Sequence, residues 1–295
     1  MSVSFAGLGV ALATPFGRSG DVDEPALRRL VGRQVDGGVD VLVPCGTTGE
    51  AATMSEAEQL RVVGIALEES KGRAFVLAGA GSNDTKVAIA RSRKMAEAGA
   101  HGILSVGPYY NKPTPEGFFR HFTAVAEASP VPVILYNVPS RTGSNIDAKT
   151  LLRLAAHPNI VGVKEASGSM AQQMEILRER PKGFLFLSGD DAVTLPLMAL
   201  GAEGVISVAG NEVPGEMKSL VASAAAGDFK KAREIHERLL PLMNLNFVES
   251  SPVPLKCALA LLGICEEVLR LPLWPATAAT RESMRHVLKD LGLLS

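Results

Sequence analysis

The stretch IVGVKE at residues 160–165 sets both the fold class and the chemistry that the sequence predicts. Its apolar, β-branched residues are typical of a strand buried on both faces, as in a parallel sheet covered by helices. Lys164 stands near the end of this strand, where burial would strip its amine of water. Either the lysine pairs with Glu165 or reaches into solvent, or an apolar setting lowers its pKa and makes it a nucleophile. The stretch alone favours the first interpretation.

Seven further apolar runs alternate with longer segments of helical periodicity, and this βαβα order predicts a parallel sheet with helical crossovers. The eight expected strands are residues 9–13, 39–43, 74–78, 102–106, 133–136, 161–164, 184–187 and 204–207. Because eight strands close a (β/α)8 TIM barrel, we expect that α/β fold. A doubly wound open sheet is the alternative, but its first strand would normally lead into a glycine-rich loop, and here it leads into TPFG at 14–17.

Helix start signals follow several of these runs. SEAE at 55–58 is a capping box, Thr114 precedes a proline at a first helical position, and Asp84 and Asp147 are expected N-caps. After the eighth strand the helical segments follow one another without a strand between them, over residues 214–226, 229–242, 254–262 and 280–291. We therefore predict a barrel catalytic domain over residues 1–227 and a C-terminal helical extension over residues 228–295.

Composition narrows the class of protein. The 295 residues are 46% hydrophobic, and 30 basic and 31 acidic residues give a scattered net charge of -1, which argues against a nucleic-acid partner. Without an export signal at the start or an apolar run of membrane-spanning length, we expect a soluble, cytoplasmic protein with no membrane partner. The three cysteines and five histidines show no metal-ligand spacing, so we expect neither a metal nor a disulfide framework.

Reactive side chains follow several strands at their expected carboxyl ends, where barrel enzymes have their active sites. GTTGE at 46–50 offers hydroxyls and backbone amides to a carboxylate, or is an ordinary turn. GPYYNKP at 107–113 contains two of the three tyrosines, which an interface loop would also explain. YNVPSRTG at 136–143 contains an arginine and the third tyrosine, which a core aromatic would also explain. Together with Lys164 they indicate Schiff-base chemistry, in which lysine attacks a ketone, tyrosine shuttles the proton and arginine holds a carboxylate.

Five motifs in register resemble the dihydrodipicolinate synthase family. They are GTTGE at 46–50, PYYNKP at 108–113, YNVPSRTG at 136–143, GVKE at 162–165 and SGDD at 188–191, within a similarity that runs from about Gly7 to Leu294. The glycine-threonine turn and the lysine identify only the wider superfamily, whose members act on different aldehydes. The arginine in PSRTG is what points to the synthase.

The resemblance implies a TIM barrel with a helical C-terminal domain that assembles as a homotetramer of two tight dimers. It also implies that pyruvate condenses with L-aspartate 4-semialdehyde, the first committed step of lysine (diaminopimelate) biosynthesis. No cofactor is implied beyond the covalent imine of pyruvate with the enzyme. Another pyruvate-dependent aldolase or lyase, of the N-acetylneuraminate lyase type, is the alternative. A catalytically silent barrel that senses an oxo acid would leave the reactive side chains without a reason to occur together.

The resemblance also assigns roles by position. The catalytic set is Lys164 for the imine, Tyr136 for proton transfer, Thr47 as the link between tyrosines, and Tyr110 as the tyrosine donated across the tight dimer. The substrate-binding set is Thr48 for the pyruvate carboxylate, Arg141 for the semialdehyde carboxylate, and Gly189 and Ile206 as pocket lining.

One part of the family pattern is altered. Lysine-inhibited members bind lysine at the dimer interface with histidines after the glycine-threonine turn and a glutamate after the Gly-x-Asn segment. Here those positions are Glu56, Gln59 and Val87, while Asn83 and Tyr109 are retained. Because the carboxylate that would hold the amine is missing at Val87, we expect weak or absent feedback inhibition, with Glu56 as the argument against.

Overall fold

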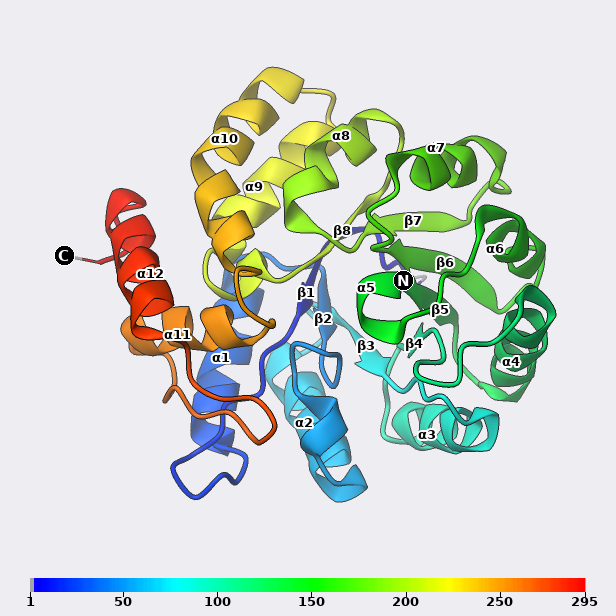
Figure 1. Cartoon of the computed structure of the whole chain (residues 1–295), viewed down its shortest axis with the longest axis horizontal. Helices are drawn as coiled ribbons and strands as arrows, with labels where there is room; N and C mark the ends of the chain where they lie inside the picture. The colour runs from blue at the N-terminus through cyan, green and yellow to red at the C-terminus, as the bar shows by residue number, and fades with distance from the viewer. Residues whose placement is uncertain (1–2, 295) are drawn as a thin grey trace.

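The computed structural model describes residues 3–294, and within them eight parallel strands close into a barrel in chain order (Figure 1). β1 pairs with β8, so the ladder has no open edge. The strands are β1 (Gly7–Ala11), β2 (Val41–Val43), β3 (Phe75–Gly79), β4 (Gly102–Val106), β5 (Val133–Asn137), β6 (Ile160–Glu165), β7 (Leu185–Ser188) and β8 (Gly204–Ser207). The predicted (β/α)8 barrel is confirmed.

Helices follow the strands, most of them on the outside of the barrel, while the short α5 lies over its end (Figure 1). They are α1 (Glu24–Asp36), α2 (Glu56–Ser70), α3 (Thr85–Glu97), α4 (Pro115–Ala128), α5 (Pro139–Thr142), α6 (Ala148–Leu154), α7 (Met170–Glu179), α8 (Thr194–Ala199) and α9 (Pro214–Ala225). The predicted start signals are confirmed, since Ser55 closes its capping box with Glu58 and the side chains of Asp84, Thr114 and Asp147 accept hydrogen bonds from first-turn amides.

The barrel has two apolar cores, because successive side chains of a strand point alternately to its two faces. One core fills the space between the strands and the surrounding helices. The other fills the barrel interior and is built mainly from alternate strand residues, among them Val43, Leu104, Ile134, Tyr136 and Ile206. Tyr136 thus belongs to the interior of the barrel, beside the polar groups described below.

The second strand begins later than the apolar run predicts. The amide of Val39 donates to the carbonyl of Gln34 at 3.1 Å, and so continues the end of α1 instead of joining the sheet. Asp40 then turns its carboxylate to the amide of Leu8 at 2.8 Å. The backbone of Asp40 still bonds to both neighbouring strands, to the carbonyl of Leu8 and from the amide of Phe75 at 2.9 Å each. The local bond therefore removes only Val39 from the pairing, and the regular strand β2 starts at Val41.

The C-terminal extension consists of α10 (Phe229–Leu245), α11 (Val253–Leu261) and α12 (Ala278–Asp290). α10 packs on α8 and α9, and α12 packs on α10 and α11 (Figure 1). Gly227, with φ of 79°, turns the chain between α9 and α10, where Asp228 caps the new helix. The domain boundary at this glycine stays a prediction. No helix within residues 3–294 has the length and apolarity needed to cross a bilayer.

Candidate active site at the carboxyl ends of the strands

Lys164 and Tyr136 lie side by side inside the barrel because β5 and β6 pair them in register. The lysine Nζ lies 4.3 Å from the centroid of the tyrosine ring, and the two residues are only 5% and 7% exposed. Glu165 lies on the opposite side of the strand, where its carboxylate accepts from the Asn137 side chain at 3.0 Å and from the Ser167 amide at 2.6 Å. The expected alternative, a Lys164–Glu165 pair, is therefore wrong.

Burial sets the protonation of the lysine. The pKa of Lys164 is lowered to about 8, chiefly by loss of hydration; the negative charge of Asp191 opposes this shift and the positive charge of Arg141 adds to it. Asp191 is itself buried, and its carboxylate accepts hydrogen bonds from the amides of Val208 and Ala209 at 2.9 Å each. A buried amine with this pKa is largely available as a nucleophile in mildly alkaline solution.

The same burial has the opposite effect on the tyrosine. Loss of hydration raises the pKa of Tyr136 to about 12, opposed by the charge of Arg141 and by a side-chain hydrogen bond with Thr47. The phenol therefore keeps its proton near neutral pH and can donate it. Burial thus shifts the two pKa values apart, so that above about pH 8 a neutral amine lies beside a protonated phenol, the pair of states that imine formation needs.

The turn after β2 supplies the two threonines. The amide of Glu50 donates to the carbonyl of Thr47 at 3.0 Å and closes the turn, and the Thr14 hydroxyl donates to the Gly49 carbonyl at 2.8 Å. Thr47 is exposed at the surface of the site and Thr48 is buried. The side-chain hydrogen bond with Tyr136 places Thr47 beside the phenol, and its role as the link to Tyr110 stays a prediction.

Arg141 lies on the short helix α5 directly after β5, and its Nη2 donates to the carbonyl of Ser251 at 3.1 Å. Its charge is close enough to lower the pKa of both Lys164 and Tyr136. The contact with Ser251 ties the arginine to the C-terminal extension. Sequence reasoning missed this contact, because a backbone carbonyl leaves no signal in the side-chain pattern.

The remaining predicted residues are placed as follows. Ile206 is buried on β8 in the barrel interior. Gly189 follows β7, where an added Cβ would lie 2.7 Å from the Cβ of Ala166, so close packing by itself requires a glycine there. Tyr110 is 89% exposed on the loop after β4, and the structure of the single chain leaves its ring in solvent, outside the buried pair.

The predicted insensitivity to lysine stays a prediction, but its residues are now placed. Val87 is partly exposed on α3, and its side chain offers no hydrogen bond. Glu56 forms an ion pair of 2.5 Å with Lys94, so its charge is partly offset by a group of this chain.

Among residues 3–294 no three or more histidine, cysteine or acidic side chains gather as a possible metal site.

Fold and site together define the class of this protein, a (β/α)8 barrel with a buried lysine suited to Schiff-base chemistry at the carboxyl ends of its strands. The chain belongs to the dihydrodipicolinate synthetase family, whose model matches residues 4–291.

Named relatives agree with this membership. The chain is 50% identical to the 4-hydroxy-tetrahydrodipicolinate synthase of Chlorobium phaeobacteroides, over 98% of both chains. Among solved structures it resembles dihydrodipicolinate synthase from Aquifex aeolicus, with 45% identity, a TM-score of 0.95, and coverage of 98% of this chain and 99% of that one. The chloride-inhibited synthase from Acinetobacter baumannii, solved in complex with pyruvate, matches with 40% identity and a TM-score of 0.97 over 99% of this chain and 100% of that one.

Proposed function

We propose that this chain condenses pyruvate with L-aspartate 4-semialdehyde and acts as a 4-hydroxy-tetrahydrodipicolinate synthase in lysine biosynthesis. The observation that carries the proposal is the buried Lys164, with a pKa of about 8 and its amine 4.3 Å from the ring of Tyr136. The relatives that carry this name match along nearly the whole chain, which supports the same assignment.

In the proposed reaction, the neutral amine of Lys164 adds to the C2 carbonyl of pyruvate and forms a C–N bond. The resulting hydroxyl leaves as water when it receives a proton, and the imine remains. Tyr136 is the proton donor in this step, because its high pKa keeps the phenol protonated. The phenolate of Tyr136 then takes a proton from C3 to give the enamine, whose C3 attacks the aldehyde carbon of the second substrate while the phenol returns the proton to the aldehyde oxygen. The amino group of the semialdehyde then adds to C2, closes the ring and releases the amine of Lys164. No oxidant, reductant or metal is needed to balance these steps.

We assign the carboxylates of the two substrates to different groups. Thr48 and the amides of its turn would hold the carboxylate of pyruvate, and Arg141 would hold that of the semialdehyde through its guanidinium. Gly189 and Ile206 would line the pocket. In support, Arg141 is exposed and lies within electrostatic reach of both Lys164 and Tyr136.

We further propose a cytoplasmic homotetramer of two tight dimers, in which Tyr110 of each chain completes the site of its neighbour. The exposed ring of Tyr110 supports this arrangement, since a tyrosine that is 89% exposed has no partner to shield it in the single chain. Tyr110 also has a φ of 73°, an uncommon conformation for a residue with a side chain, which is the kind of strain found at functional loops.

The proposal is tested by following pyruvate consumption with L-aspartate 4-semialdehyde beside a panel of other aldehyde acceptors. Turnover with the semialdehyde alone supports the synthase. Turnover with another acceptor keeps the imine chemistry and overturns the substrate, in favour of a lyase of the N-acetylneuraminate type. If borohydride also fails to trap a pyruvate adduct, the chain has no imine chemistry at all.

Imine formation is expected to depend on pH through Lys164. At a pKa of about 8 the neutral fraction of the amine rises from about 1% at pH 6 to about 50% at pH 8, so the initial rate of borohydride-trapped adduct formation at low pyruvate should rise about 50-fold. It should level off above about pH 9. A rate that continues to rise toward pH 10.5 would show that the lysine keeps the pKa of an exposed amine.

Replacement of Arg141 by alanine is expected to raise the KM for the semialdehyde by about 10- to 100-fold, the cost of losing a charge-assisted hydrogen bond. The rate of adduct formation with pyruvate should change less than about threefold. The conservative variant Arg141→Lys keeps the charge without the planar fork, and its KM for the semialdehyde should lie between those of the parent and Arg141→Ala. Equal losses in both measurements would mean that the arginine supports the fold through Ser251 rather than binding the second substrate.

A further inference from the structure

A second buried lysine lies outside the catalytic pair, and its partner belongs to the glycine-threonine turn. The Nζ of Lys256, on α11, lies 2.6 Å from Glu50 Oε1, at ion-pair distance without hydrogen-bond alignment. The two side chains are 0% and 1% exposed. A fully buried ion pair is often no more stabilising than apolar side chains of the same volume. What this pair contributes is therefore better sought in the geometry that it fixes.

The lysine end of the pair is anchored in the C-terminal extension. Its Nζ donates to the carbonyl of Val268 at 2.7 Å and lies 4.1 Å from the centroid of the Phe16 ring. Burial lowers the pKa of Lys256, and the adjacent charge of Glu50 opposes this shift. The ammonium thus has a carbonyl, a carboxylate and an aromatic face around it, which fix its position on three sides.

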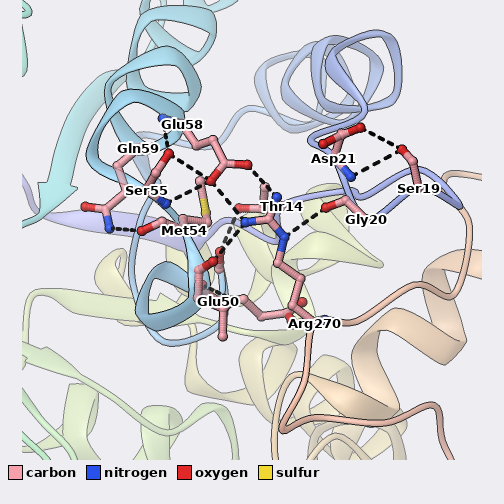
Figure 2. Close-up of polar contacts among 12 residues, drawn as sticks. Thr14, Ser19, Gly20, Asp21, Glu50, Met54, Ser55, Glu58, Gln59 and Arg270 are labelled. Atoms are coloured by element: carbon pink, nitrogen blue, oxygen red, sulfur yellow. Dashed lines mark hydrogen bonds and ion pairs between the residues drawn. The ribbon is translucent and has the colours of Figure 1, made fainter.

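The glutamate end stands at the last residue of the turn. Glu50 has a φ of 53°, in the left-handed region that favours glycine, and its amide closes the turn onto the carbonyl of Thr47. Its other carboxylate oxygen accepts from the backbone amide of Arg270 at 3.1 Å (Figure 2). A glutamate persists in such a conformation when surrounding contacts over-determine it, and here these contacts come from the C-terminal extension.

We propose that Lys256 is a positioning residue, whose ion pair with Glu50 holds the turn so that Thr47 meets Tyr136. The amine of Lys256 contacts Glu50, Val268 and Phe16, none of them a reacting group of the proposed chemistry, so the lysine acts through Glu50. The proposal rests on the imine chemistry proposed above and goes beyond it, because it assigns a role in proton transfer to the C-terminal extension.

One partial reaction reports the relay without the second substrate. In D2O the pyruvate imine loses a proton from C3, the electron pair of that bond moves toward the imine carbon to form the enamine, and a deuteron returns to C3 through Tyr136 and Thr47. Deuteration of the pyruvate methyl group, followed by NMR, measures this transfer. Borohydride trapping on Lys164 measures imine formation separately, so each variant can be scored for both.

The decisive variant is the double replacement Glu50→Gln with Lys256→Met, which keeps the volume and removes both charges. We expect a Tm within a few degrees of the parent, a full adduct at saturating pyruvate, and methyl exchange slowed by at least about tenfold. A stable double variant that exchanges at the parent rate would overturn the proposal. Lys256→Met alone leaves Glu50 buried and unpaired, and should lower both the Tm and the exchange rate.

Arg270→Met is the matched control, because Arg270 is a second cation of the C-terminal extension that packs near the same turn. Its guanidinium pairs with Glu58 and donates to the carbonyl of Gly20 at 2.8 Å (Figure 2). It also lies 4.4 Å from the Phe16 centroid and donates to the carbonyl of Thr53 at 2.9 Å. We expect a lower Tm, but exchange per trapped adduct within about twofold of the parent. Exchange slowed as much as in the double variant would assign the effect to the whole segment and overturn the specific role of the pair. A parent chain that forms no adduct would instead overturn the proposed function.

Discussion

Lys164→Ala is expected to abolish turnover, with kcat reduced by more than about 1,000-fold, since loss of a covalent nucleophile can cost up to about a millionfold. The variant should also lose the borohydride-trapped pyruvate adduct, which mass spectrometry measures on the intact chain. Stability should not fall, because the parent buries an amine that is costly to keep charged and alanine removes this cost.

A matched control separates this lysine from the others. Lys182 is exposed in the segment between α7 and β7, and Lys182→Ala should leave both the adduct and the rate unchanged. An adduct of full yield in Lys164→Ala would place the imine on another lysine. The buried Lys256 would then be the first to test, since burial lowers its pKa as well.

Tyr136→Phe is the second change with a large expected effect. It removes one oxygen and keeps the ring against which the lysine packs, so the barrel interior should stay filled. We expect kcat to fall by about 100- to 10,000-fold, the range typical for loss of a general acid or base. Deuterium exchange at the methyl group of pyruvate should fall in parallel.

The adduct distinguishes the role of the phenol from a structural one. If Tyr136 only transfers protons, Tyr136→Phe should still reach a full adduct on long incubation with pyruvate and borohydride, only more slowly. A variant that never forms the adduct although its Tm is unchanged would mean that the hydroxyl is needed to bind pyruvate. Turnover within about tenfold of the parent would mean that another group carries the proton.

The fold could be predicted from sequence because each strand has an apolar run of its own and helix start signals lie between the runs. The ends of the strands could not be predicted, since Val39 is apolar enough for a strand while its amide is bound to α1. Tyr136 and Lys164 pair because they stand near the ends of the neighbouring strands β5 and β6. The motifs YNVPSRTG and GVKE already place the two residues at the ends of these strands.

The contribution of the C-terminal extension could be predicted only in part. α11 reads VPLKCALAL, an apolar run with one lysine, which is the signal that singles out Lys164 in β6. Read in the same way, Lys256 would have been a candidate for a special environment. Its partner Glu50 could not have been found, because no local pattern links two residues that meet only when the whole barrel has closed. The role of Asp191 in opposing the pKa shift of Lys164 was missed for the same reason.

The contacts between Arg270 and the first part of the chain also bear on the order of events during synthesis. The backbone amide of Arg270 and the carboxylate of Glu50 are joined across 220 positions, so the turn after β2 leaves the ribosome long before the residues that hold it. A nascent chain can thus close its barrel around Lys164 while its proton relay is still loose. Burial of the amine therefore needs only the barrel, whereas the proposed hold on its proton relay needs the C-terminal extension as well.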